Sequence, residues 1–491
     1  MNKAAPAGFN QNQMFLTSHA TARALPIILL LLMVGPTGGC QSYRAKPLTA
    51  AAVDKSLRTP AWQTLKKRAA HFAKIAVGSL RLQPRHGLFP AEAAIIAVLA
   101  NPNLRAMRDM RGEASAQLMQ AGILPNPQLS ESTDFVTGGF RTDTFTAYGL
   151  SLNWNLTRLI DRQARMAAAR YHRGQIDLEI AWREWQVAMA ARIAVYNLAV
   201  AMKQKRQALL AAAELAKGYA VARKAYHARL TTVLEYNAAR AATRQANDLI
   251  LKLNQTMALQ KLALARVMGV PPRTPISISA RLTLPSHVSL PPQPVLVADM
   301  ERYRPDLLAL QLGYKSQEQR LRAAILRQFP NISIGFQQAS DNTNVHTTGF
   351  GVTVDIPIFD RNQGNIAIQK ATRRELFDSY ISRVFKGRSD VAIAVTNVHD
   401  LTARIAALEK SVNSLETLVR RYRQALRLGN TDVVTYYTLI GQLVDRRIRL
   451  IALKGRLEQN LLALELASGQ VLKQRAKNAA PSRVRHRSPH S

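Results

Sequence analysis

The segment "GFGVTVDIPIFDRNQGN" (349–365) decides which kind of fold this chain can form. In its first half, small or polar residues alternate with apolar ones, which are Phe350, Val352, Val354, Ile356 and Ile358. A period of two predicts a β-strand with one apolar and one polar face, followed by a polar turn. The edges of a single such strand would be open, so partner strands must come from elsewhere in the chain or from other copies of it.

The chain as a whole is apolar enough to fold and strongly basic. It has 491 residues, 47% of them hydrophobic, and its 67 Lys and Arg against 31 Asp and Glu give a formal net charge of +36. That charge predicts either a polyanionic partner or a surface adapted to an unusual medium. The ten histidines lack the paired spacing of zinc sites, and no catalytic constellation is visible. We therefore expect no enzymatic activity and no metal site.

The apolar run "LPIILLLLMVG" (25–35) precedes the only cysteine of the chain, Cys40. It is far shorter than the roughly 20 residues that span a bilayer as a helix, so it predicts the core of a secretion signal covering 1–39. A cysteine at this place resembles the lipobox of bacterial lipoproteins, which implies a covalent lipid such as palmitate on Cys40 and no other cofactor. Thr37 departs from the usual lipobox leucine, whereas Gln41 fits sorting to the outer membrane. The alternative is a free thiol in an ordinary signal peptide.

The chain contains one unit twice, with the copies offset by 200 to 205 residues. We name the copies repeat one (88–268) and repeat two (298–472). A proline-rich linker (269–297) separates them, an N-terminal extension (40–87) precedes them, and a basic tail (473–491) predicts disorder. The matching segments are "NPNLRA" (101–106) with "RPDLLA" (304–309), "LPNPQL" (124–129) with "FPNISI" (329–334), and "YGLSLNW" (148–154) with "FGVTVDI" (350–356).

Each repeat is predicted to form a helix, two strands, a long helix, a turn and a return helix. The first helices are expected at 91–123 and 301–328, each ending against a proline. The proline-free stretches 163–229 and 363–429 can each form one helix of roughly 100 Å at 1.5 Å per residue, too long for a compact domain. Their apolar residues, spaced by four and three, favour coiled-coil packing, although a soluble bundle has the same pattern. The expected fold class is mainly α, a long α-helical coiled-coil barrel with four β-strands per protomer.

The four strands of one protomer would leave open edges, which in lipid cost several kcal/mol for each unpaired N–H or C=O. Membrane barrels need at least about eight strands, and each strand here has roughly the 9 to 11 residues that span a bilayer. We therefore predict a membrane β-barrel shared between copies of the chain. Its wet lumen would be faced by Ser151, Asn153, Asn155, Thr353 and Asp355. Lipid would be faced by Leu150, Leu152, Trp154, Leu156, Phe350, Val352, Val354 and Ile356.

Several segments between 88 and 470 resemble the TolC-like outer-membrane efflux proteins. The most specific is "VDIPIFDRNQGNI" (354–366), beside "AGILPNPQL" (121–129) and "RYRQALRLGNTDVVTYYTL" (421–439). The resemblance implies a homotrimer with a twelve-stranded barrel in the outer membrane of a Gram-negative bacterium and a helical tunnel through the periplasm. It also implies a passive conduit in a tripartite efflux pump, whose partners are outer-membrane lipid, a periplasmic adaptor and an inner-membrane transporter driven by protons or ATP. No nucleic acid is expected.

In that family, the turns between long and return helices form a periplasmic tip that docks on the helical hairpins of an adaptor and constricts the pore. The resemblance makes Glu235 a candidate pore gate, because three copies around one axis would repel one another or attract a cation. Repeat one has Arg229 where repeat two has Gly429, so we expect the two turns to be built differently. The docking residues implied are Arg229, Leu230, Thr231, Leu428, Gly429, Asn430 and Asp432, although a plain helix hairpin would explain the same residues.

Other functions stay open at the level of sequence. A channel of this fold could export small molecules or metal cations, and the segment "AGILPNP" (121–127) favours this branch of the family. Alternatively, the channel could serve type I protein secretion. A basic coiled-coil scaffold that binds nucleic acid would explain the charge and the heptads, but not the signal segment or the duplicated strands. The scaffold would stay soluble and bind in a salt-dependent way, whereas the channel would sediment with outer membranes.

Overall fold

The structure, a computed structural model, describes four stretches of the chain: 42–58, 87–139, 144–428 and 432–472. The predicted signal segment, Cys40 and the basic tail lie outside the described residues. The chain divides after Ser56 into a short N-terminal part and a large part, with helix α2 (Ala50–Leu57) at the boundary. Both repeats belong to the large part.

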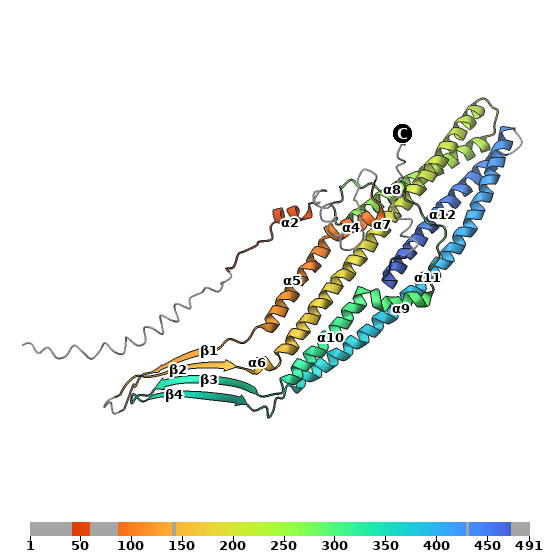
Figure 1. The fold of residues 1–491 in the computed structure, drawn as a ribbon. Helices are drawn as coiled ribbons and strands as arrows, with labels where there is room; N and C mark the ends of the chain where they lie inside the picture. The colour runs from red at the N-terminus through yellow and green to blue at the C-terminus, as the bar shows by residue number, and fades with distance from the viewer. Residues whose placement is uncertain (1–41, 59–86, 140–143, 429–431, 473–491) are drawn as a thin grey trace, which may run out of the picture. The chain divides into compact units, whose positions relative to one another are not determined.

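The two repeats have the same order of elements, and the strands lie at one end of the helices (Figure 1). The turns between long and return helices lie at the other end. Repeat one consists of α4 (Pro90–Ala100), α5 (Pro102–Gly122), β1 (Gln128–Asp134), β2 (Ala147–Asn155), α6 (Thr157–Ile160), α7 (Arg162–His227) and α8 (Val233–Met268). Together with the linker's end, repeat two contributes α9 (Gln293–Tyr303), α10 (Pro305–Leu326), β3 (Asn331–Ser340), β4 (His346–Asp355), α11 (Gln363–Arg427) and α12 (Val433–Ser468). The expected fold class is confirmed.

The first helix of each repeat is broken in two, which corrects the prediction of single helices at 91–123 and 301–328. The breaks fall at Asn101, before Pro102, and at Arg304, before Pro305. Both residues have extended backbone conformation, because the ring of a following proline disfavours the α region. A proline is well tolerated in the first turn of the helix that follows, so each break starts a new helix rather than ending the helical segment.

The end of the return helix supports each break. Asn101 Nδ2 donates a hydrogen bond to Val267 O at 3.1 Å, and Arg304 Nη1 donates to Ala467 O at 3.3 Å. Each return helix is followed by a glycine in the left-handed region, Gly269 with φ of 67° and Gly469 with φ of 75°. A side chain at Gly269 would place its Cβ 2.6 Å from Asn101 Cα, so the close approach requires glycine.

Helix α7 joins the two repeats, because it packs against α4, α5 and α8 of its own repeat and against α10 and α12 of the other. One apolar cluster lies between α4, α7 and α8 around Leu198 and Leu264. A second lies between α11 and α12 around Ile405 and Leu457. A third joins α7, α8, α11 and α12 toward the turns, and includes Leu415 and Val419 of the apolar seam predicted for α11.

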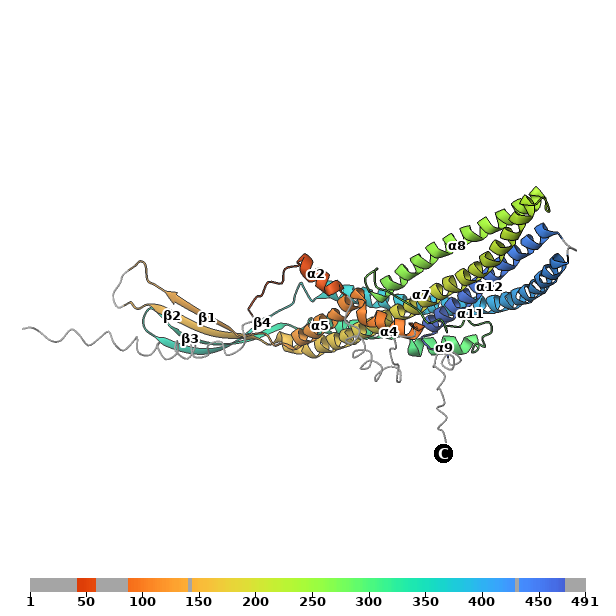
Figure 2. The ribbon, with the colours of Figure 1, turned by 90° about the horizontal axis from the view of Figure 1, so that it is seen from above.

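The four strands form one antiparallel sheet in the order β1-β2-β3-β4. The central pairing of β2 with β3 connects the repeats, and β1 and β4 are the edges of the sheet in this chain. Figure 2 shows the curved sheet extending beyond the helices, with no long helix lying over it. The sheet is therefore left without a covering layer by the elements that the structure describes.

Candidate functional site

The strand register sorts most polar and apolar side chains onto opposite faces of the sheet, although Glu131 pairs with Leu150 on the apolar face. Residues paired across neighbouring strands share a face, so the pairs Asn153–Gly335 and Ser333–Thr353 define a polar face. The apolar face follows from Leu152–Phe336 and Phe336–Phe350. All five residues predicted to face a lumen lie on the polar face, namely Ser151, Asn153, Asn155, Thr353 and Asp355. Six of those predicted to face lipid lie on the apolar face, namely Leu150, Leu152, Trp154, Phe350, Val352 and Val354.

Leu156 and Ile356 are not strand residues, which corrects their place in the predicted apolar face. Leu156 has α-helical dihedral angles (φ −90°, ψ −12°) because the chain turns there into α6. Its N–H still donates to Ile332 O at 2.8 Å and continues the ladder by one bond. Ile356 follows the last residue of β4 and is 76% exposed.

The apolar face is uncovered in the single chain. Phe350 is 71% exposed, Val352 57% and Phe336 50%. Each of these side chains would gain roughly 1.5–3 kcal/mol on full burial, so a continuous exposed face of this kind indicates contact with lipid or protein. The strands also contain no Lys or Arg, although the chain has 67 of them. Their acidic residues are Glu131, Asp134 and Asp355.

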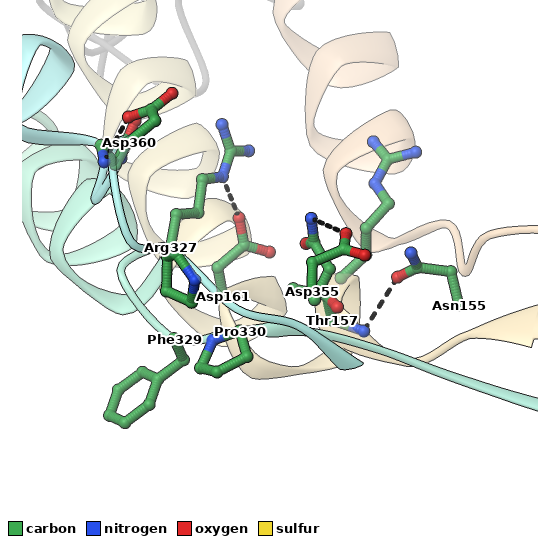
Figure 3. A pocket seen from close by; sticks show the side chains of 12 residues that line it. Asn155, Thr157, Asp161, Arg327, Phe329, Pro330, Asp355 and Asp360 are labelled. Carbon is green, nitrogen blue, oxygen red and sulfur yellow. Dashed lines mark hydrogen bonds and ion pairs between the residues drawn. The ribbon is translucent and has the colours of Figure 1, made fainter. Parts of the chain in front are cut away.

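A buried carboxylate holds the sheet end of the helices together (Figure 3). Asp161 is 3% exposed, and its Oδ1 and Oδ2 accept hydrogen bonds from Arg165 Nε and Arg327 Nε, each at 2.7 Å. Arg165 Nη1 also donates to Ala121 O at 3.2 Å. Charge-assisted bonds of this length are strong, and here they tie the ends of α5, α7 and α10 at the junction with the sheet. The sequence reasoning missed this cluster, whose signal is one aspartate among the arginines of "TRLIDRQAR" (157–165).

The turn of repeat one has a left-handed residue that is not glycine. Arg229 has φ of 58°, a conformation that costs L-residues roughly 1–2 kcal/mol. Leu230 N–H donates to Ala225 O at 2.8 Å and Arg229 N–H to Tyr226 O at 3.0 Å, which closes the end of α7. Arg229 takes the backbone conformation for which glycine is usually used at the end of a helix. Gly429 and Asn430 lie outside the described residues.

The candidate gate residue Glu235 is bound into the cap of α8. Thr232 Oγ1 accepts from Glu235 N–H at 3.2 Å, and Glu235 Oε2 accepts from Thr232 N–H at 3.0 Å, which forms a capping box. Glu235 Oε2 also accepts from the Thr231 hydroxyl. The Thr231 bond, followed by those from Thr232, lowers the pKa of the Glu235 carboxyl below its ordinary value. Within the chain its role is therefore helix capping.

The remaining predicted tip residues divide between the two turns. Asp432 caps α12 by accepting from Val434 N–H at 3.0 Å and Thr435 N–H at 2.9 Å. These bonds, that from Val434 first, lower the pKa of its carboxyl. Leu428 is 69% exposed and Leu230 81%. The two turns thus combine carboxylates fixed by caps with freely exposed leucines.

A polar network that the sequence reasoning missed links three helices behind the turns. Arg423 Nη2 of α11 lies 3.0 Å from Glu214 Oε1 of α7, and Arg423 Nε donates to the Tyr436 hydroxyl of α12 at 3.1 Å. The Tyr436 hydroxyl donates in turn to Glu214 Oε1 at 3.3 Å. On the other side, the rings of Tyr226 and Tyr236 stack with centroids 4.8 Å apart. The network therefore connects α11 and α12 of repeat two to α7 of repeat one.

Comparisons with known proteins agree with this arrangement. Residues 296–470 match the model of the family described as outer membrane efflux protein. The chain is 24% identical over 397 residues to the cobalt-zinc-cadmium resistance protein CzcC of Cupriavidus metallidurans, covering 79% of this chain and 92% of CzcC. It is 23% identical over 389 residues to the cation efflux system protein CusC of Escherichia coli, covering 76% of this chain and 84% of CusC.

Solved structures with the same fold include one described as a transmembrane channel and one described as an outer membrane protein. A crystal structure of CusC superimposes with a TM-score of 0.66 at 20% identity, covering 80% of this chain and 96% of that one. The outer membrane protein VceC of Vibrio cholerae superimposes with a TM-score of 0.64 at 19% identity, covering 78% and 96%. Long helices with a small antiparallel sheet at one end are thus a known arrangement in outer-membrane proteins.

Proposed function

We propose that this chain, whose residues 296–470 match the outer membrane efflux protein family, is the passive conduit of a tripartite efflux system. The observation that carries the proposal is the uncovered sheet, apolar on one face and polar on the other, at one end of helices more than sixty residues long. Such a sheet is stable in a bilayer only when its edges are paired. Other copies of the chain would supply that pairing.

The assembly we propose is a homotrimer, as the family resemblance implies. Three copies of β1 to β4 would close a barrel of twelve strands, above the minimum of about eight for a membrane barrel. The apolar face with Phe350 and Val352 would contact lipid, and the polar face with Asn153 and Thr353 would line the lumen. A lipid on Cys40 would add an anchor in the outer membrane.

For the substrate, we propose metal cations or small cationic molecules. The relatives CzcC and CusC are named for cation resistance and cation efflux. The described strands bear Asp134 and Asp355 on the polar face and no Lys or Arg, so a lumen lined by that face would not repel cations. The turns would dock a periplasmic adaptor coupled to an inner-membrane transporter, and Glu235 would lie near the axis as a candidate gate.

A pair of neighbouring substitutions tests the membrane assignment. Val352→Arg would place a charge toward lipid, which costs up to about 2–4 kcal/mol for each copy near the bilayer midplane, whereas Thr353→Arg would point into a wet lumen. We expect Val352→Arg to be lost from the outer-membrane fraction and Thr353→Arg to remain there as an oligomer. Equal behaviour of the two variants, or recovery of the unaltered protein in a soluble fraction, would contradict the proposal.

A further inference from the structure

The turn of repeat one is surrounded by unpaired positive charge. We name the ends of α7 and α8 with the turn between them the repeat-one tip (217–244). All six of its Lys and Arg side chains are exposed, and none forms an ion pair among the residues that the structure describes. Its one carboxylate, Glu235, is held by hydrogen bonds from Thr231 and Thr232. The six basic residues are Lys217, Arg223, Lys224, Arg229, Arg240 and Arg244.

The same tip exposes apolar side chains where the first turn of α8 begins. Leu230 is 81% exposed, Leu234 68% and Val233 57%. At the corresponding place in repeat two, Val433 and Val434 are half-buried. At these two positions, the apolar side chains of α8 are therefore more exposed than those of α12.

Arg229 adds a second reason to assign a ligand to this tip. Its left-handed backbone is one that glycine adopts without strain and an arginine does not. The arginine keeps an exposed positive charge in the turn, at the expense of local backbone stability. Strain at an exposed turn indicates a function for the side chain that is retained there.

We propose that the repeat-one tip is the anchor of the docking surface, and that its partner is an acidic helical hairpin with apolar residues between its carboxylates. The hairpin's apolar side chains would pack on Leu230, Val233 and Leu234, and its carboxylates would pair with the basic residues around them. The inference rests on the proposed function for the existence of a docking partner. Beyond the proposed function, it specifies the chemistry of the docking partner and the repeat to which the partner binds.

A matched pair of peptides tests the inference on the full-length protein in detergent. Two synthetic helical hairpins share the same leucine pattern, but one has Glu and the other Lys at the flanking positions. We expect the Glu hairpin to bind at least about tenfold more tightly at an ionic strength of roughly 0.01 M, and to lose most of this advantage at roughly 0.15 M. Equal binding of the two hairpins, or tighter binding of the Lys hairpin, would overturn the inference.

Variants locate the binding and separate charge from backbone. We expect Arg229→Gln and Arg229→Gly both to bind the Glu hairpin several-fold more weakly, while only Arg229→Gly becomes more resistant to unfolding. Leu234→Ser should also weaken binding. Leu262 is likewise an exposed leucine of α8 but lies outside the tip, so Leu262→Ser should leave binding unchanged. If Arg229→Gly binds as well as the unaltered protein, the arginine is not a docking residue and the inference fails.

Conductance in planar bilayers distinguishes this failure from failure of the conduit itself. A protein that conducts but does not prefer the Glu hairpin would overturn the partner chemistry and leave the proposed function standing. A protein that binds the Glu hairpin through the repeat-one tip but does not insert into a bilayer would overturn the conduit and support the basic docking surface.

Discussion

At the break between its two short helices, repeat one has Asn101 and repeat two has Arg304. Both side chains donate to a carbonyl at the end of the return helix, of Val267 and Ala467 respectively. Asn101 also caps its own helix by accepting from Asn103 N–H at 2.9 Å, whereas Arg304 forms a buried bidentate pair with Asp306 at 3.0 and 2.7 Å. The guanidinium of Arg304 further lies 4.9 Å from the ring centroid of Trp182 on α7.

In both repeats the side chain at the break bonds a backbone carbonyl at the end of the return helix. The two repeats differ in the other interactions that hold that side chain in place. Both repeats have a helix break followed by a proline. In repeat one, the short amide of Asn101 is sufficient to bond the carbonyl of Val267 and to cap α5. In repeat two, the break also packs against α7 of the other repeat. There the buried ion pair of Arg304 with Asp306 has the role that the amide of Asn101 has in repeat one. The halves of the protein should therefore respond unequally to equivalent substitutions.

The largest inequality is expected from removing the two side chains at the breaks. Arg304→Ala leaves the buried Asp306 with only the 3.4 Å contact to Arg383, and loss of a buried partner costs about 3 kcal/mol or more. Asn101→Ala removes a helix cap and costs about 1 kcal/mol. Hydrogen exchange of the α10 and α5 amides measures both opening free energies. Equal losses in the two repeats would contradict the comparison.

A smaller inequality is expected at the glycines that end the return helices. Gly269→Ala combines a positive φ with a Cβ 2.6 Å from Asn101 Cα, so we expect a loss of about 2 kcal/mol or more. Gly469→Ala meets its nearest atoms, on Arg304, at 3.0 Å and should cost less. Thermal unfolding in detergent ranks the two variants.

Gly441→Ala, within α12, is the matched control for these substitutions. A Cβ there would have no neighbour within 4 Å, and alanine is the better helix former by about 0.5–1 kcal/mol. We expect Gly441→Ala to raise the unfolding temperature slightly. If all three glycine variants are destabilised alike, the close approach at the breaks is not what requires glycine.

The sequence was sufficient to predict the strands and their two faces, because a period of two is a local signal. The polar and apolar faces follow from residues such as Asn153 and Phe350 without knowledge of the register. The long helices were predictable in the same way from their apolar spacing. The breaks at Asn101 and Arg304 were missed although each precedes a proline, because the apolar residues on both sides of the break suggest one continuous helix.

The clusters that hold the fold together were not predictable, since they join residues far apart in the chain. Glu214 and Tyr436 are 222 positions apart, and Asp161 and Arg327 are 166 apart. Only the packing of α7 against the other repeat brings such pairs together. The left-handed conformation of Arg229 was not predicted for a different reason, because intrinsic preference argues against an arginine in that region and only the surrounding turn overrides it.

The smallest expected effect concerns pH and again compares the turns. Hydrogen bonds to the carboxylates of Glu235 and Asp432 lower their pKa below the ordinary 4.5 and 3.8, so each contributes stability above that value and loses it as the pH falls through the lowered pKa. Burial has the opposite effect on Glu465 and raises its pKa, so this carboxyl contributes stability at low pH that is lost as the pH rises above 4.5. The pH dependence of global unfolding therefore combines contributions of opposite sign from these carboxyls.

Variants that keep the cap but remove the charge therefore give the clearer test. Glu235→Gln keeps a capping box and Asp432→Asn keeps an N-cap, so each removes only the charge near the helix N-terminus. We expect slightly faster hydrogen exchange in the first turns of α8 and α12 at pH 7, and no difference from the unaltered protein once the pH is well below the lowered pKa. Glu375→Gln on α11 is the control and should leave both turns unchanged at either pH. A difference that persists unchanged in acid would mean that geometry, and not charge, makes these caps effective.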